Sequence, residues 1–111
     1  MPVVTISIDE SLAEQKGVVG ETLCGAVSDA VNRWLKPKPG TFQWIARWGD
    51  DVGPSYPVYL QIQFRESDER GADVVASLMQ ELAQVIKDHL NAESRIRAFA
   101  IDQAILFARD S

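Results

Sequence analysis

The sequence predicts an α+β fold in which two consecutive β-α-β units form a four-stranded mixed sheet with two helices on one face. Three observations predict it. Four short segments alternate in the manner of strands, two longer segments carry apolar residues at helical spacing, and the two halves of the chain repeat the same order. The 111 residues suit one domain, residues 1–111, built from halves of about 1–55 and 56–111.

The first half is expected to contain two strands. Over residues 3–8, Val4, Ile6 and Ile8 occupy every second position, which is the period of a strand. Residues 41–48 are rich in aromatic and β-branched side chains, as strands are. The glycines and the proline of residues 49–55 predict a loop after the second strand.

A helix is expected between these two strands. Ser11 and Glu14 have the spacing of a capping box at its start. Its apolar residues form one stripe that can face a sheet: Val19, Leu23, Val27, Ala30, Val31 and Trp34. Three glycines within residues 17–25 weaken its first turns, so we predict an irregular beginning. Residues 36–40 include two prolines and end the helix, because proline cannot continue its hydrogen-bond ladder.

The second half repeats this order. Residues 58–64 alternate as a third strand, residues 67–70 are expected to start a helix, and residues 95–101 form a fourth strand. The second amphipathic helix carries Val75, Leu78, Leu82, Val85, Ile86 and Leu90. Residues 104–108 are a short apolar tail.

An internal repeat supports the division into halves. A shift of 56 residues superposes apolar positions in the same order, for example Ile45 on Ile101. Because crossovers in β-α-β units are right-handed, the two strands of each half are expected to run parallel. The sheet face opposite the helices still carries apolar side chains, Phe99 and Ile101 among them. We therefore expect oligomerisation to cover that face.

Composition limits the possible functions. The chain is 46% hydrophobic, and its net charge of −5 argues against nucleic acid or an anionic membrane as the main partner. The single Cys24 cannot form an intramolecular disulfide, and neither a secretory leader nor a spanning segment is apparent, so we expect a cytoplasmic protein. No nucleotide-binding motif or metal-ligand spacing occurs, and we expect no cofactor and no metal.

Proline directly after Met1, the apolar first strand and the repeated β-α-β order resemble the tautomerase superfamily. Within it, the second half is most similar to 5-carboxymethyl-2-hydroxymuconate isomerases, through residues 85–89 (VIKDH) and 93–96 (ESRI). The resemblance spans nearly the whole chain and is concentrated in residues 70–101. It implies a homotrimer around a barrel of three sheets, which would cover the open sheet face.

Pro2 is the candidate catalytic residue. Removal of Met1 is favoured before a small residue and would leave a secondary amine at the chain end. An unperturbed α-amino group titrates at about 7.7–8.0, so modest desolvation makes it a usable neutral base. Such a base takes a proton from the carbon next to a carbonyl and returns it elsewhere. Taken alone, the Met-Pro start is also compatible with the ordinary beginning of a strand.

Arg70 is the first candidate substrate-binding residue. The resemblance places it at the arginine that the isomerase family uses toward the substrate carboxylate. A guanidinium beside the exposed N–H groups of a helix start also suits an anion. The alternative is a solvated arginine beside Asp68 and Glu69.

Arg47 is the second candidate substrate-binding residue. It lies in the second strand between Trp44 and Trp48. There it would either bind a carboxylate or enolate oxygen, or pack its stem on tryptophan. The family often has an arginine near the start of this strand, where this chain has Phe42.

Three functions remain open. The first is an isomerase (tautomerase) that acts on a small unsaturated carboxylate, an enol or keto compound, with Pro2 as general base. The second is a related proline-dependent hydratase, dehalogenase or decarboxylase, in which protonated Pro2 is an acid and Asp50 or Asp51 activates water. The third is a non-catalytic trimer that keeps only the fold. The pH dependence of activity separates the first two, because a base must be neutral and gains rate as the pH rises.

Overall fold

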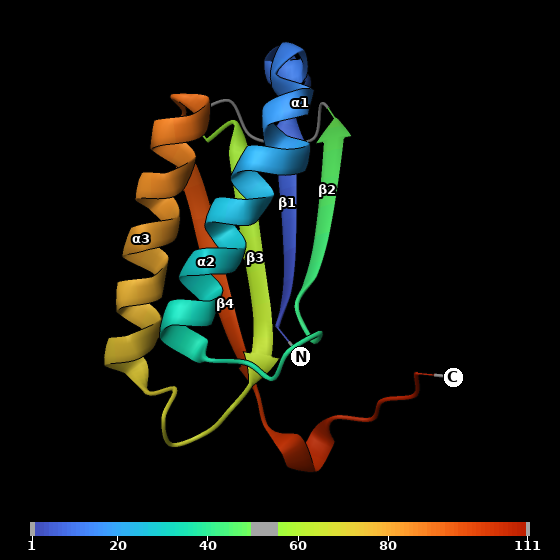
Figure 1. Ribbon diagram of the computed structural model, residues 1–111, viewed down its shortest axis with the longest axis vertical. Helices are drawn as coiled ribbons and strands as arrows, with labels where there is room; N and C mark the ends of the chain where they lie inside the picture. The colour runs from blue at the N-terminus through green and yellow to red at the C-terminus, as the bar shows by residue number, and fades with distance from the viewer. Residues whose placement is uncertain (1, 50–55, 111) are drawn as a thin grey trace.

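The core of the structure is a four-stranded mixed sheet (Figure 1). The computed structural model describes residues 2–49 and 56–110. The strands are β1 (Val3–Asp9), β2 (Gln43–Gly49), β3 (Val58–Arg65) and β4 (Ser94–Ile101), in the spatial order β2-β1-β3-β4. β1 runs parallel to β2 and β3 parallel to β4, whereas the central pair, β1 and β3, is antiparallel. The predicted sheet of two β-α-β units is confirmed.

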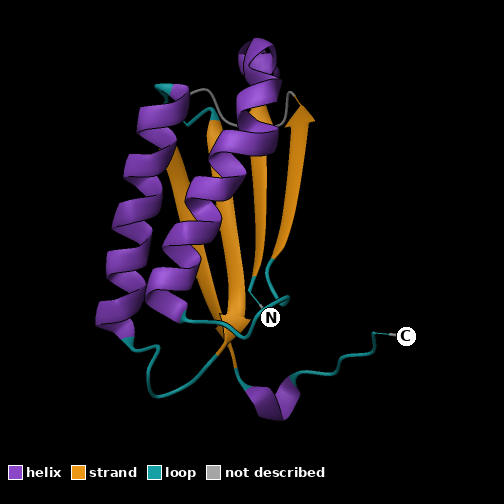
Figure 2. Ribbon diagram, viewed as in Figure 1, coloured by secondary structure: helices purple, strands orange, loops and turns teal. Residues whose placement is uncertain are grey.

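Two helices pack on one face of this sheet, as predicted (Figure 2). They are α2 (Cys24–Leu35) and α3 (Ala72–Leu90), and each buries one apolar stripe. The chain reaches α2 through a 3₁₀ segment at Glu10–Gln15, the short α1 (Lys16–Val18) and a π-helical turn at Val19–Leu23. The irregular beginning predicted from the glycines is therefore present.

The start of the first helical segment differs from the prediction. Asp9 acts as its cap, because the Asp9 carboxylate accepts a hydrogen bond from the backbone N–H of Ser11 at 3.0 Å. The hydroxyl and the backbone N–H of Ser11 both lower the pKa of Asp9. Ser11 lies inside the 3₁₀ segment and is not the cap that the sequence pattern predicted.

The segments that connect strands and helices explain the other boundaries. α3 begins at Ala72, after the predicted start region, because residues 67–70 form a turn closed by the Arg70 N–H and the Ser67 carbonyl at 3.1 Å. α2 ends at Leu35, and Lys36 takes a left-handed conformation with φ of 47°. Gly40, with φ of 79°, completes the turn into β2 in a conformation that glycine adopts at little cost.

The hydrophobic core lies between the sheet and the two helices. β1 and β3 contribute alternate residues from their helix-facing side, and α2 and α3 contribute their apolar stripes. The most deeply buried large side chains include Phe64, Ile6, Ile8, Leu23, Leu60, Ile62, Leu78, Leu82, Ile86 and Leu90. The predicted helical stripes are thus the core, except that Trp34, Val75 and Val85 are only partly buried at its margin.

The face opposite the helices is more polar than the sequence indicated. The strand register forms three rows across all four strands of this face: Gln43, Val3, Gln63 and Phe99; then Ile45, Thr5, Gln61 and Arg97; then Arg47, Ser7, Tyr59 and Arg95. A shorter row, Arg65 and Ile101, crosses β3 and β4 only. Phe99 is 47% exposed, so the expected apolar side chains are present. Most positions in these rows are nevertheless polar, and burial of apolar surface alone is a weaker reason for oligomerisation than we expected.

After β4 the chain leaves the sheet. A single 3₁₀ turn, Gln103–Ile105, is followed by residues without regular structure that run away from both helices (Figures 1 and 2). Throughout the described residues, no helix combines the length and the apolar character needed to cross a membrane.

Candidate functional site

Pro2 is buried immediately before β1. Its carbonyl accepts a hydrogen bond from the Gln43 N–H at 2.9 Å. Extending the strand register by one residue sets Pro2 opposite Phe64 of β3 and beside Phe42, which precedes β2. Because strand residues two apart face the same side, Pro2 shares the helix-facing side with Val4. The candidate base therefore stands between two aromatic side chains.

Arg70 lies at the same end of the sheet as Pro2. Its guanidinium carbon is 5.9 Å from the centroid of the Phe64 ring. Nε donates a hydrogen bond to the Leu35 carbonyl at 3.1 Å, and Nη1 donates to the Arg65 carbonyl at 2.9 Å. An arginine has five N–H groups, so three remain for a ligand. Pro2 and Arg70 thus both adjoin one phenylalanine, Phe64.

Among the described residues, no ion pair matches the charge of Arg70. In residues 2–49 and 56–110, ion pairs join Arg33 to Glu81 and Lys87 to Glu93. The alternative of pairing with Asp68 or Glu69 is therefore not observed. Arg70 is also not part of an anion site at the start of α3. It precedes the helix cap, Gly71, by one residue, and its guanidinium contacts two backbone carbonyls rather than the free N–H groups of the helix.

Arg47 lies away from this end of the sheet. It is exposed and pairs with Ser7, five residues from Pro2 along β1, or about 17 Å at strand spacing. Trp44 and Trp48 pair with Val4 and Ile8, which face the helices, whereas Arg47 pairs with Ser7 on the open face. Arg47 and the two tryptophans therefore lie on opposite faces of the sheet. Of the two alternatives for Arg47, packing of its stem on these tryptophans does not fit the register, because adjacent strand residues face opposite sides. Within one chain, Arg47 does not join Pro2 and Arg70.

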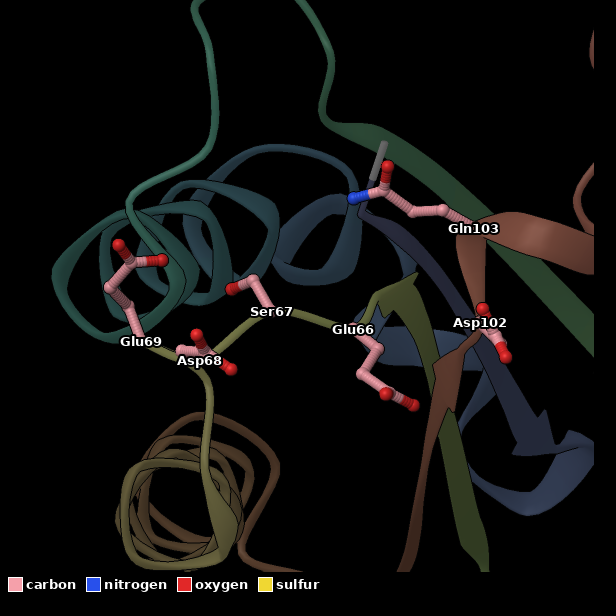
Figure 3. A pocket seen from close by; sticks show the side chains of 6 residues that line it. All are labelled: Glu66, Ser67, Asp68, Glu69, Asp102 and Gln103. Carbon is pink, nitrogen blue, oxygen red and sulfur yellow. The ribbon is translucent and has the colours of Figure 1, made fainter.

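A pocket of about 510 Å³ opens near Pro2, where β3 and β4 end (Figure 3). One wall is the segment after β3 and the other is the segment after β4, and the described lining residues are Glu66, Ser67, Asp68, Glu69, Asp102 and Gln103. The Glu66 N–H donates a hydrogen bond to the Ile101 carbonyl at 2.9 Å and holds the two segments together. Four carboxylates therefore line a pocket at the end of the sheet that contains Pro2 and Arg70, although neither of these two lines it.

The sequence patterns predicted a helix start at residues 67–70 and did not reveal this pocket. The signal was the topology, because the carboxyl ends of two parallel neighbouring strands meet at one edge of a sheet. Polar residues that follow the third and fourth predicted strands, such as Glu66 and Asp102, are brought together there. In the described part of the chain, no group of three acidic, histidine or cysteine residues is arranged to hold a metal ion. Asp50 and Asp51 lie outside the described residues; Gly49, before them, pairs with Asp9 at the end of β1 far from Pro2.

On the helix side, Glu81 of α3 joins the two helices. It accepts hydrogen bonds from the Arg33 guanidinium and, at 3.1 Å, from the Trp34 indole of α2. Burial alone would raise the pKa of Glu81, but these hydrogen bonds and the Arg33 charge bring it below its ordinary value. This ion pair stabilises the helical layer and does not contact Pro2 or Arg70.

Solved structures share this fold. This chain matches the structure of Pt0534 inactivated by 2-oxo-3-pentynoate with 20% identity and a TM-score of 0.77. The match covers 96% of this chain and 90% of the Pt0534 chain. The chain matches a fused 4-OT symmetric trimer with 15% identity and a TM-score of 0.74, over 97% and 92% of the two chains. It also matches N1, a member of the cis-3-chloroacrylic acid dehalogenase family, with 12% identity and a TM-score of 0.75, over 98% and 81%.

No family model matches the sequence, and no curated protein matches it significantly. The structural matches establish a tautomerase-like fold for this chain. At identities of 20% and below they establish the fold alone.

Proposed function

We propose that this protein is an isomerase (tautomerase) that moves a proton within a small unsaturated carboxylate, with Pro2 as the general base and Arg70 as the carboxylate ligand. The observation that carries the proposal is the position of both residues beside Phe64. The tautomerase-like fold supports it as an analogy. The finer resemblance to 5-carboxymethyl-2-hydroxymuconate isomerases, the cytoplasmic location and the duplication of residues 1–55 and 56–111 belong to the same proposal.

The surroundings of Pro2 have two opposing effects on the protonation of its amine. After removal of Met1, the Pro2 amine would stand between Phe42 and Phe64, and an apolar environment favours the neutral form that a base requires. The carboxylates of the nearby pocket, Glu66 and Asp102 among them, favour the protonated form. The balance of these effects decides which chemistry Pro2 performs.

Arg70 has the chemistry to hold a carboxylate. Its guanidinium is fixed by the Leu35 and Arg65 carbonyls, so little side-chain freedom is lost when a ligand binds. Its three remaining N–H groups suit a charge-assisted, two-point contact with a carboxylate. We propose that Arg47 binds substrate in a site shared between chains, since it is far from Pro2 in its own chain.

We propose that the working form is a homotrimer. The match to a fused 4-OT symmetric trimer supports it, as does the open sheet face, which no helix covers. A ring of three sheets would place the polar rows of this face inside the assembly.

A second candidate function is a proline-dependent hydratase, dehalogenase or decarboxylase. The acidic pocket favours it, because a carboxylate is the group that activates water while protonated Pro2 donates a proton. Glu66 and Asp102 are further candidates for that carboxylate, alongside Asp50 and Asp51, which lie outside the described residues. A non-catalytic trimer is the third candidate.

One experiment tests the proposed isomerase. Phenylenolpyruvate-like and muconate-like enols are offered to the native protein and to protein whose N-terminal amine has been chemically blocked. Enzymatic ketonisation that disappears on blocking supports the proposal. Absence of turnover across this set, with a folded and oligomeric protein, favours the non-catalytic trimer.

A further inference from the structure

A second pocket, also of about 510 Å³, lies in the helical layer. The two helices run in opposite directions, so the last turn of α2 lies beside the first turn of α3 (Figure 1). The described residues that line the pocket come from both places: Arg33, Trp34, Leu35, Lys36, Glu69 and Val74. Neither Pro2 nor Arg70 is among these residues, so the pocket is separate from the candidate site. We call it the helix-end pocket.

The apolar part of the helix-end pocket is held in place before any ligand arrives. Leu35 is buried, and Trp34 packs against the core. The Trp34 indole N–H donates a hydrogen bond to Glu81 of α3 at 3.1 Å, which fixes the ring. A fixed aromatic side chain loses little freedom when a ligand packs against it. The volume also falls in the range of small-molecule sites, about 300–1,000 Å³.

The pocket also keeps one unpaired charge of each sign. Arg33 is already neutralised by its ion pair with Glu81. The ion pairs found in residues 2–49 and 56–110 include neither Lys36 nor Glu69, although both side chains line the same pocket. A ligand with a single charge would be attracted by one of these two groups and repelled by the other. A ligand that carries both charges suits the pair.

We propose that the helix-end pocket binds a free amino acid with an apolar side chain. Its carboxylate pairs with Lys36, its ammonium group pairs with Glu69, and its side chain packs on Trp34. Such a ligand uses the charged and the apolar groups of the pocket together, as small-molecule sites do. The inference is independent of the proposed function, because none of these three residues belongs to the candidate site.

Calorimetric titration with three related compounds tests the chemical class of the ligand. L-Phenylalanine carries both charges, 3-phenylpropionate lacks the ammonium group, and phenethylamine lacks the carboxylate. L-Phenylalanine is expected to bind about tenfold or more tightly than either analogue, since each analogue loses one charge-assisted contact. In NMR spectra, the indole N–H signal of Trp34 should shift on binding, whereas those of Trp44 and Trp48 in β2 should not. Equal binding of the three compounds, or no binding of L-phenylalanine at millimolar concentration, would overturn the proposal.

Two variants test the residues without disturbing the fold. Lys36 has a left-handed backbone with φ of 47°, which glycine adopts more easily, so Lys36→Gly removes the charge and suits the turn. Glu69→Gln removes the other charge and keeps the shape of the side chain. Each is expected to weaken the binding of L-phenylalanine about tenfold or more. Glu69→Gln should also strengthen the binding of 3-phenylpropionate, because it removes a repulsion.

Matched controls are the neighbouring residues of the same charge that are not among the described lining residues of the helix-end pocket. Lys38→Gln and Asp68→Asn change exposed residues and should leave the affinity for L-phenylalanine unchanged. Binding that survives both Lys36→Gly and Glu69→Gln, or that falls equally in the controls, rejects the pocket. None of these measurements depends on activity, so this result would leave the proposed isomerase untouched.

Discussion

The Nε of Arg70 donates a hydrogen bond to the carbonyl oxygen of Leu35, the last residue of α2, at 3.1 Å. The same guanidinium also bonds to the carbonyl of Arg65 at the end of β3. One side chain therefore joins the end of a helix to the end of a strand and offers its remaining N–H groups to a ligand. Any test of Arg70 in catalysis must consequently measure stability as well.

Replacing Arg70 by alanine is expected to affect stability and activity separately. Loss of two hydrogen bonds costs about 1–3 kcal/mol of unfolding free energy, which chemical denaturation measures. The kcat/KM for a carboxylated substrate should fall about ten- to a hundredfold, and for a carboxylate-free enol much less. Arg65→Ala is the control, because its side chain is exposed and only its backbone carbonyl contacts Arg70. Equal activity of Arg70→Ala on both substrates would make Arg70 purely structural.

The pH dependence of kcat/KM is expected to run in opposite directions for the two roles of the Pro2 amine, general base and general acid. A general base must be neutral, so kcat/KM should rise with pH through the amine pKa, which is about 7.7–8.0 when unperturbed. Intact mass should show that Met1 has been removed. Pro2→Ala should reduce activity on both substrate types, since it alters proton transfer itself. Activity that falls as the pH rises through this range assigns an acid role, and active protein that retains Met1 contradicts the mechanism.

Neutralising the acidic pocket separates isomerisation from water activation. If Pro2 is a base, Glu66→Gln and Asp102→Asn should each lower KM for a carboxylate substrate about two- to fourfold. Each change removes one negative charge from the end of the sheet, and the repulsion of the substrate should fall by about 0.4–0.8 kcal/mol. If a pocket carboxylate activates water, one of the two changes should reduce kcat about a hundredfold or more. Asparagine keeps an oxygen that can cap residue 104, so the turn after β4 is preserved. Steady-state kinetics with both variants distinguish these results.

The pair of Glu81 and Arg33 predicts a pH dependence of stability. The pKa of Glu81 is lowered in the folded protein, so its contribution is complete above the ordinary value of 4.5 and is lost as the pH falls through the lowered pKa. The Arg33 side chain is 57% exposed, which limits the ion pair to about 1 kcal/mol or less. Denaturation at pH 6 should therefore distinguish wild type from Glu81→Gln, and the difference should shrink near pH 3. A difference that grows on acidification contradicts this assignment.

The sequence predicted the fold from patterns that are local. Val4, Ile6 and Ile8 have the period of a strand whatever surrounds them, and the glycines before α2 weaken helix wherever they occur. Parallel pairing within each half followed from the handedness of crossovers, which holds across folds. These features depend on neighbours in the chain or on general rules of topology.

The site was less predictable because its contacts are distant in sequence. Nothing near Arg70 indicates that its guanidinium will bond to Leu35, which is 35 positions away. The face of the sheet on which Arg47 lies depends on whether it pairs with Ser7 or with Ile8 of β1. Only the register of β1 and β2, in which Arg47 pairs with Ser7, decides this. The pocket of Glu66 and Asp102 exists because β3 and β4 end together. Strand pairing, rather than residue type, decided these features.

The π-helical turn at Val19–Leu23 has a geometric consequence for the helix that follows. Buried residues recur at intervals of four, at positions 19, 23, 27, 31 and 35. In an ideal α-helix each such interval overshoots a full turn by about 40°, so four of them would rotate position 19 by about 160° relative to position 35. The wider turn advances the chain by less angle per residue and takes back part of that rotation. The π-helical turn therefore lets residues spaced four apart, from Val19 to Leu35, stay on the side of the helical segment that faces the sheet.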